Sequence, residues 1–183
     1  MNASEYLSLK VLLVEKGYGE EAKWANDVKL CDDPDVFAYE AVWVVLSAGM
    51  KNQVVEGIYR KMIEALQQGK LLLNLFRHKS KVKAIEYIWK NRGWLFSQFQ
   101  QVNSENAKLA FLNTLPWIGD ITKYHLARNL GLDFCKPDRH LVRIARGYSM
   151  TPEELCHKLA KETGERIGVV DVVLWRAANL GII

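Results

Sequence analysis

The sequence predicts an all-α fold, because apolar residues recur at helical spacing, capping residues stand where helices would start, and no strand-like alternation appears. The chain has 183 residues, of which 49% are hydrophobic, enough to bury one sizeable core or two smaller ones. The spacing is clearest on one predicted helical face, made of Val55, Ile58, Tyr59, Met62, Ile63 and Leu66. Residues three and four apart share a helix face, so this segment is expected to be an amphipathic helix.

The first half of the chain contains two further helix starts. Asp33 followed by Pro34 is typical of an N-cap with proline in the first turn. The helix that follows is apolar on every side over residues 41–46, which predicts a central, buried position. Ser80 is expected to cap another helix, which would end at Gly93.

The second half contains a pair of helices and then a capping box. The pair is predicted over residues 107–115 and 121–130, and Gly131 would end the second helix in the left-handed conformation. Thr151 and Glu154 have the spacing at which a threonine and a glutamate satisfy each other's backbone N–H groups. These signals extend the all-helical prediction to the whole chain.

The hairpin between the paired helices has the sequence LPWIGDIT at residues 115–122. Proline and glycine break one helix here and the next begins, so unpaired backbone N–H groups at the helix start point outward. Such groups bind anions, and the phosphates of a nucleic-acid backbone are suitable ligands. We therefore predict that the hairpin holds nucleic acid.

A second motif, KPDRHL at residues 136–141, places the carboxylate of Asp138 after a proline and among basic residues. The net charge of +4 and the pI near 8.9 are mild, so polyanion binding would depend on a local cluster. Such a cluster is present and consists of Lys136, Arg139, Arg143 and Arg146. Taken alone, this run would be interpreted by default as a solvated helix face.

Together the two motifs resemble the helix-hairpin-helix DNA glycosylases, the superfamily that includes endonuclease III and the 3-methyladenine glycosylases. A third segment, VLSAGMKNQVV at residues 45–55, resembles the Leu-Ser-Ala-Gln segment with which the family presents a DNA-probing loop. The resemblance extends over roughly residues 35–148. It implies a two-lobed helical glycosylase fold, with one lobe at residues 30–131, a second built from residues 1–29 and 132–183, and an active-site cleft between the lobes.

The resemblance also assigns roles to individual residues. Asp138 would be the catalytic carboxylate, which stabilises the positive charge that develops on the sugar or activates water. The DNA contacts would come from Gly49, Met50, Trp117, Gly119, Ile121, Thr122, Lys123 and Arg139. The backbone carbonyls of Asn113, Leu115 and Ile118 would hold a monovalent cation, K⁺ or Na⁺.

Several of these positions keep a structural alternative. Asp138 could serve only as a helix N-cap, and Met50 could fill the core after Gly49 ends a helix, in place of wedging into DNA. Trp117 stands where the family has glycine, so its Cβ could tilt the hairpin, and its ring would either stack on DNA or pack inward. Trp43 and Trp117 are the candidates for an aromatic wall of the base pocket.

Ile121 occupies the position at which bifunctional family members carry a nucleophilic lysine. We therefore expect a monofunctional base-excision repair enzyme that hydrolyses the N-glycosidic bond of a damaged base flipped out of duplex DNA. A cationic alkylated purine would gain from an indole face, with uracil or mismatch removal as the alternative lesion class. A catalytically inactive helix-hairpin-helix DNA-binding protein is the alternative to an enzyme, and an all-helical protein-interaction domain is a third possibility.

The cysteines bear on cofactors and compartment. Cys31, Cys135 and Cys156 are far apart and odd in number, which favours free thiols in a reducing, intracellular setting such as the cytoplasm and nucleoid or the nucleus. The iron–sulfur cluster of many family members needs four closely spaced thiolates, so we expect no such cluster here. No apolar run approaches membrane-spanning length, and residues 1–5 are acidic where a signal peptide would be basic. We expect a monomer that binds double-stranded DNA with a damaged base and no membrane.

Overall fold

The computed structural model describes residues 1–50 and 52–183, and all regular secondary structure in these residues is helical. The all-α prediction is therefore confirmed. Contacts within the chain divide it into two compact units, one of residues 1–29 and 131–183 and one of residues 30–130. The sequence analysis places the second boundary one residue later, after residue 131.

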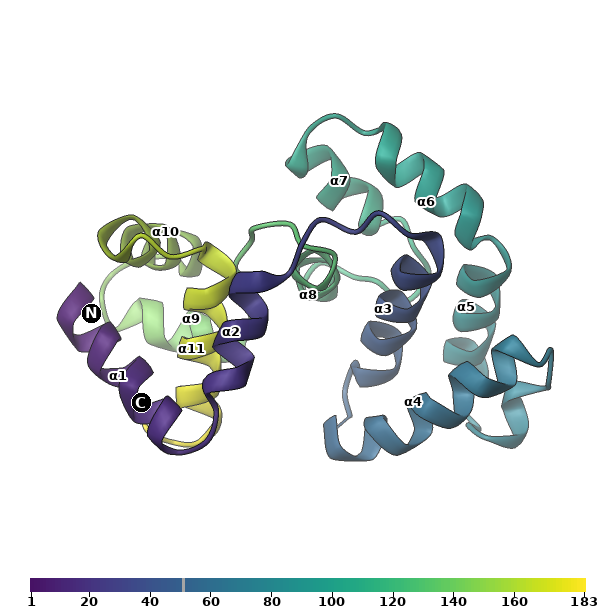
Figure 1. Cartoon of the computed structure of the whole chain (residues 1–183), viewed down its shortest axis with the longest axis horizontal. Coiled ribbons are helices and arrows are strands. Elements are labelled where there is room, and N and C mark those ends of the chain that lie inside the picture. The colour runs from purple at the N-terminus through teal and green to yellow at the C-terminus, as the bar shows by residue number, and fades with distance from the viewer. Residues whose placement is uncertain (51) are drawn as a thin grey trace. The chain divides into compact units, whose positions relative to one another are not determined.

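The unit built from both ends of the chain, here called unit 1, contains five helices (Figure 1). They are α1 (Ala3–Glu15), α2 (Gly19–Asp27), α9 (Arg139–Arg146), α10 (Pro152–Thr163) and α11 (Ile167–Asn179). The last of these is central, because α11 packs against the other four. Its first two turns are buried on nearly every side, so it forms the core onto which the terminal segments fold.

Polar contacts of Arg166 and Asp133 join the two ends of the chain within unit 1. Arg166 donates to the carbonyls of Val28 and Gly131, both at 2.8 Å. Asp133 accepts from the backbone N–H groups of Ile167 and Gly168, at the start of α11. These bonds satisfy helix-end groups that the helix itself leaves unpaired, and they fix the point where the chain enters unit 1 for the second time.

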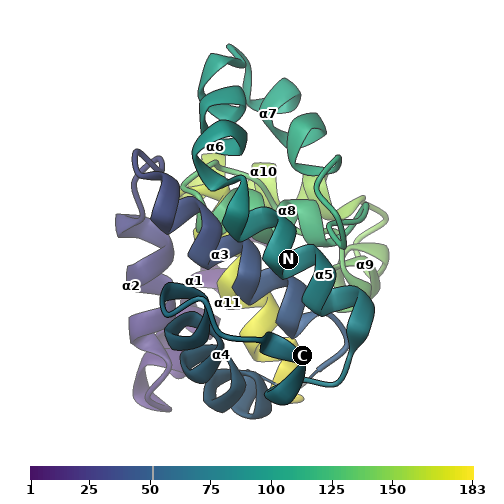
Figure 2. The ribbon, with the colours of Figure 1, turned by 90° about the vertical axis from the view of Figure 1, so that its right-hand side faces the viewer.

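Unit 2 contains a central helix, α3, that is covered by several others. Its elements are α3 (Pro34–Ser47), α4 (Asn52–Gln67), the short 3₁₀ helix η1 (Leu72–Asn74), α5 (Lys79–Lys90), α6 (Arg92–Gln101), α7 (Glu105–Leu112) and α8 (Thr122–Asn129). Figures 1 and 2 show α5 and α6 following one another along α3, and α3 also packs on α4 and α8. The predicted central position of residues 41–46 is confirmed, since all of them except Trp43 are buried.

The predicted capping and stop residues are confirmed in most places, and two of them, Ser80 and Gly93, are wrong. Asp33 caps α3, and Thr151 and Glu154 form the capping box of α10. His78, not Ser80, caps α5, because its ring nitrogen accepts the Lys81 N–H. Gly93 does not end that helix, since Asn91 already separates α5 from α6 and Gly93 lies inside α6.

The first helix beside the hairpin begins two residues earlier than predicted and ends three residues earlier, because three-residue turns replace its last turn. The second is one residue shorter than predicted at each end. Gly131 takes the left-handed conformation expected of it, with φ of 87°. Among the described residues, no helix is long and apolar enough to cross a membrane.

Candidate active site and nucleic-acid interface

The hairpin at residues 115–122 belongs to unit 2 and connects α7 to α8. Its tight turn is closed by the Ile118 N–H, which donates to the Leu115 carbonyl at 3.1 Å. Trp117 adopts the left-handed conformation, with φ of 67°, which costs a residue with a Cβ about 1 to 2 kcal/mol. The hairpin thus keeps a conformation suited to glycine although tryptophan occupies the position.

The Trp117 side chain lies at the surface, not in the core as one alternative proposed. Its exposed fraction is 41%. The ring meets His78 edge-on, with 5.1 Å between ring centroids, and the Lys81 ammonium is 5.3 Å from the ring centroid. One part of the indole is therefore fixed by unit 2, and the exposed part is available to a ligand.

The hairpin amides are only partly available to a phosphate. The Gly119 N–H donates to the Thr122 hydroxyl at 2.8 Å, so an anion at this amide would have to displace that hydroxyl. Asp120 is exposed and accepts from Asn113 at 3.3 Å and from the Lys123 ammonium at 3.4 Å. Its charge opposes a nearby phosphate, and Lys123 partly compensates for it.

The proposed cation ligands lie in the same turn. The Leu115 carbonyl already accepts the Ile118 N–H, and a carbonyl oxygen has a second lone pair that can face a cation. Within the described part of the chain, no cluster of three or more His, Cys, Asp and Glu side chains is arranged to hold a metal ion. The cation at Asn113, Leu115 and Ile118 stays a prediction.

The loop after α3 is the second predicted DNA contact. Gly49 is left-handed and exposed, with φ of 76°, and Met50 donates its N–H to the Ser47 carbonyl at 3.0 Å. The Met50 side chain is half-buried, so it does not fill the core as the structural alternative proposed. Lys51, which follows, lies outside the described residues.

A buried lysine links this loop to the hairpin. Lys81 is only 2% exposed, and its ammonium donates to the carbonyls of Leu46 at 2.9 Å and Ala48 at 2.7 Å. Burial lowers the pKa of Lys81 because removal from water disfavours the charged form. The same ammonium is the one that faces the Trp117 ring.

The predicted pocket residue Trp43 is half-buried and contacts one aromatic side chain. Its ring meets Tyr59 edge-on, with centroids 5.4 Å apart. Glu40, one turn earlier on α3, accepts from the Asn129 amide at 2.8 Å, and burial raises the pKa of this carboxyl. Burial and, to a smaller extent, the charge of Glu40 raise the pKa of Tyr59 to about 12. Glu40 therefore places negative potential near the Tyr59 ring, which contacts Trp43.

Asp138 lies in unit 1 and caps α9. One carboxylate oxygen accepts from the N–H groups of His140 at 2.9 Å and Leu141 at 3.2 Å. The other is 3.5 Å from the Lys136 ammonium, and the side chain is 11% exposed. The N-cap alternative is thus correct as a description of geometry, and it fixes the carboxylate with one oxygen bound by the helix and the other outside it.

A second carboxylate positions the backbone segment that carries Asp138. Asp171, on α11, is 1% exposed and accepts the backbone N–H of Lys136 at 3.1 Å. The Asp138 N–H in turn donates to the Lys136 carbonyl at 2.7 Å. A buried carboxylate needs such partners, so Asp171 fixes the backbone two residues before Asp138.

The basic run forms a stripe along α9. Arg139, Arg143 and Arg146 are exposed and are spaced by four and three residues, which places them on one helix face. Arg143 also donates to the carbonyl of Ile183 at 2.7 Å. The stripe begins one residue after Asp138, so positive charge and the candidate catalytic group share one end of α9.

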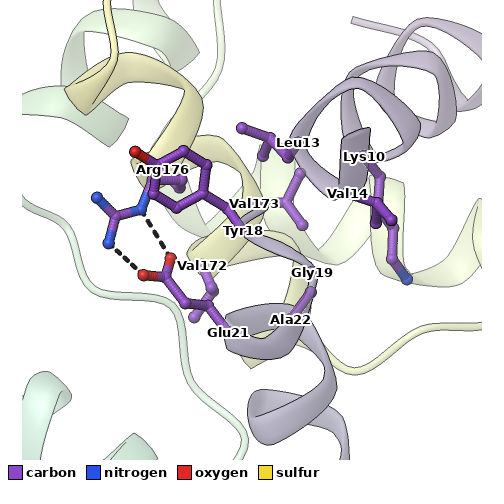
Figure 3. A pocket seen from close by; sticks show the side chains of 10 residues that line it. All are labelled: Lys10, Leu13, Val14, Tyr18, Gly19, Glu21, Ala22, Val172, Val173 and Arg176. Atoms are coloured by element: carbon purple, nitrogen blue, oxygen red, sulfur yellow. Dashed lines mark hydrogen bonds and ion pairs between the residues drawn. The ribbon is translucent and has the colours of Figure 1, made fainter. Parts of the chain in front are cut away.

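A small hollow elsewhere in unit 1 is lined by different residues (Figure 3). Leu13, Val172 and Val173 form its apolar part, and Arg176 makes a bidentate ion pair with Glu21 at its rim. The Arg176 guanidinium also lies over the Tyr18 ring, 4.7 Å from its centroid. These contacts pack α2 against α11 and include no predicted site residue.

Sequence analysis missed Lys81, Asp171 and Glu40, although two of them have a visible signal. Asp171 is the lone charge in an apolar run on α11, and Lys81 shares its helix face with Ile85 and Ile88. A charge on an apolar face indicates a buried group with a specific partner. The partner of Glu40 is 89 residues away in the chain, and no local pattern marks it.

Comparison with known proteins identifies the fold. No protein-family model and no curated protein matches the sequence. Among solved structures, the 8-oxoguanine DNA glycosylase of Methanocaldococcus jannaschii is 17% identical, with a TM-score of 0.72 over 98% of this chain and 94% of that one. The glycosylase/lyase from the same organism, bound to a 15mer DNA containing 8-oxoguanine, is 18% identical, with a TM-score of 0.70 over 98% and 97%.

A third structure agrees with these two. The 8-oxoguanine DNA glycosylase of Thermotoga maritima is 19% identical, with a TM-score of 0.64 over 95% of this chain and 96% of that one. The chain therefore has the helical fold of these DNA glycosylases along almost its whole length. At these identities the likeness establishes the fold, and activity has to be argued from the site.

The raised pKa of Glu40 predicts how the free energy of unfolding depends on pH. Because the folded state disfavours the ionised carboxyl, the free energy of unfolding should fall as pH rises through the ordinary carboxyl range. Glu40→Gln keeps an acceptor for Asn129 and removes the charge, so it should raise Tm by a few degrees at pH 8 and by less near pH 4. Thermal unfolding measures this, with the exposed Glu86→Gln as control. A lower Tm of the Glu40→Gln variant at pH 8 would contradict it.

Proposed function

We propose that this protein is a DNA glycosylase that hydrolyses the N-glycosidic bond of a damaged base in double-stranded DNA. The observation that carries the proposal is the carboxylate of Asp138, anchored at the start of α9 beside a basic stripe. The glycosylase fold of the whole chain supports it, because the fold is shared with proteins of that activity. Asp138 is the position at which the sequence resemblance puts the catalytic aspartate.

The chemistry follows from the position of this carboxylate. The target nucleotide must leave the duplex before its sugar can be reached. As the bond between the sugar carbon and the base nitrogen breaks, its electron pair leaves with the base and positive charge develops on the sugar. The Asp138 oxygen that faces away from the helix amides would stabilise this charge. Water then adds to the sugar carbon and gives its proton to the same carboxylate, which releases it to solvent. An abasic site and a free base result.

Trp43, Tyr59 and Glu40 bear on the choice of lesion. Aromatic faces and a nearby carboxylate favour a base that carries positive charge. Purines alkylated on a ring nitrogen, such as 3-methyladenine and 7-methylguanine, have this charge and a weakened glycosidic bond. We infer that they are the favoured substrates. 8-Oxoguanine is the second candidate, because the three similar structures are 8-oxoguanine glycosylases.

The binding partner and conditions follow from the same proposal. We propose that the protein acts as a monomer on duplex DNA in a reducing compartment, where its three cysteines stay free thiols. The hairpin carbonyls of Asn113, Leu115 and Ile118 would hold K⁺ or Na⁺ and so shape the phosphate contact. The competing hypothesis is a helix-hairpin-helix protein that binds DNA without excision, and the departures from the family pattern at Gly49, Trp117 and Ile121 are the observations in its favour.

Excision assays on a lesion panel test the proposed function. Duplexes carrying alkylated, oxidised, deaminated and mismatched bases are incubated with excess protein, and released bases are identified by mass. We expect release of methylated purines. Robust release of 8-oxoguanine or uracil without methylated purines would overturn the lesion assignment, and duplex binding without release of any base would favour the non-enzymatic hypothesis.

Replacement of Asp138 tests the catalytic assignment. Asp138→Asn keeps an oxygen that can accept from His140 and Leu141, so the fold and the affinity for duplex DNA should stay within a few-fold. The single-turnover excision rate should fall by about 100-fold or more, because the charge used in the transition state is lost. Asp33→Asn is the matched control, since Asp33 caps α3 in the same way. Equal excision by both variants would refute the catalytic role.

The replacement of lysine by Ile121 predicts that no strand cleavage follows base release. Borohydride should trap no covalent complex with DNA, since neither Lys123 nor Lys136 lies at the position of the family's nucleophile. Ile121→Lys is the informative variant, because Ile121 is exposed at the start of α8, and it should yield a trapped adduct. An adduct in the unmodified protein that disappears on replacing Lys123 or Lys136 would show bifunctional chemistry.

A further inference from the structure

We infer that Lys81 is a positioning residue that holds the loop at residues 47–50 and the hairpin at residues 115–121 in one arrangement for contact with a DNA strand. This inference rests on the proposed function in one respect, which is that DNA is the ligand of the two loops. The link itself is visible in unit 2, where one buried ammonium touches both segments.

The first half of the link is a set of hydrogen bonds to the end of α3. The carbonyls of Leu46 and Ala48 stand where a helix leaves its last acceptors unpaired, and Lys81 donates to both. The helix end is already closed by backbone bonds, because Ala48 donates to Val44 and Met50 donates to Ser47. A lysine is therefore not required merely to stop the helix.

The second half of the link is the contact with Trp117. The ammonium lies 5.3 Å from the ring centroid, within the range of cation–π attraction. His78, which caps the same helix that carries Lys81, meets the ring edge-on. These two contacts from the start of α5 offset the cost of the left-handed backbone at Trp117.

The charge of Lys81 adds a reason for its position. Among the described residues, its contacts are with carbonyls and a ring and not with a carboxylate. Burial of a charge is costly, and hydrogen bonds to two carbonyls could also be made by a neutral donor such as a glutamine amide. The positive charge of Lys81 is buried against two segments that are proposed to contact DNA phosphates. Because its surroundings have a low dielectric constant, its electric field is weakly screened there.

Hydrogen exchange of the free protein tests the link without any assumption about function. Lys81→Met keeps the length of the side chain and removes the ammonium, and Lys83→Met, an exposed position on α5, is the matched control. We expect amides of residues 46–50 and of residues 115–121 to exchange about tenfold faster in the Lys81 variant only, with α11 unchanged. Faster exchange in residues 46–50 alone would reduce Lys81 to a helix cap and overturn the link.

Binding to a duplex that contains an uncleavable abasic-site analogue then tests the role in DNA contact. Lys81→Met should weaken this binding about tenfold, and the loss should be non-additive with that of Trp117→Leu, because both act through one contact. Additive losses, or unchanged affinity despite faster exchange, would overturn the positioning role. If Lys81→Met does not fold, Trp117→Leu must by itself speed exchange in residues 46–50, and failure to do so would refute the link.

The glycosylase proposal and the inference about Lys81 predict separate results, so each can be refuted without the other. A protein that excises no base but shows linked exchange and linked loss of duplex affinity would refute the glycosylase proposal and leave Lys81 as a positioning residue for DNA binding. A protein that excises bases while its Lys81 variant exchanges like the control would refute the inference and leave the glycosylase proposal intact.

Discussion

Charged groups that leave water must find partners, and in each unit of this chain one buried charge has backbone groups of a candidate functional segment as partners. Asp171 is enclosed in the helical core of unit 1 and holds the segment that ends in Asp138. Lys81 is enclosed in unit 2 and holds the end of α3 and the hairpin. A core made only of apolar side chains would avoid the free-energy cost of burying charge. Here the two buried charges carry that cost, and their hydrogen bonds position loops that have no regular secondary structure.

In the hairpin, side-chain contacts offset an unfavourable backbone conformation. Tryptophan in a left-handed conformation is unfavourable, and the contacts of its ring with His78 and Lys81 oppose that cost. The result is an exposed aromatic surface at the position where the glycosylase motif that this sequence resembles has glycine. Tryptophan at this position therefore changes the surface of the hairpin, while its backbone adopts the left-handed conformation that favours glycine.

Local signals were sufficient for most of the fold. The caps at Asp33 and Thr151 and the apolar segment over residues 41–46 determine their helices through neighbours in sequence. The Glu40–Asn129 pair and the Asp171–Lys136 bond join residues 89 and 35 positions apart, so no spacing rule marks them. Asp138 was found from its motif, whereas the conformation of Trp117 and the Thr122 hydroxyl on Gly119 arise from the folded turn.

The central claim is that Asp138 meets the sugar of a nucleotide whose base is being removed. A crystal structure with a duplex that carries a cationic pyrrolidine in place of the target sugar tests it most directly, because the ring nitrogen reproduces the developing charge. We predict one Asp138 oxygen within about 3 Å of that nitrogen, with the other still bound to the α9 amides. An analogue bound beyond contact distance of Asp138, or duplex DNA bound without a flipped nucleotide, would contradict the claim.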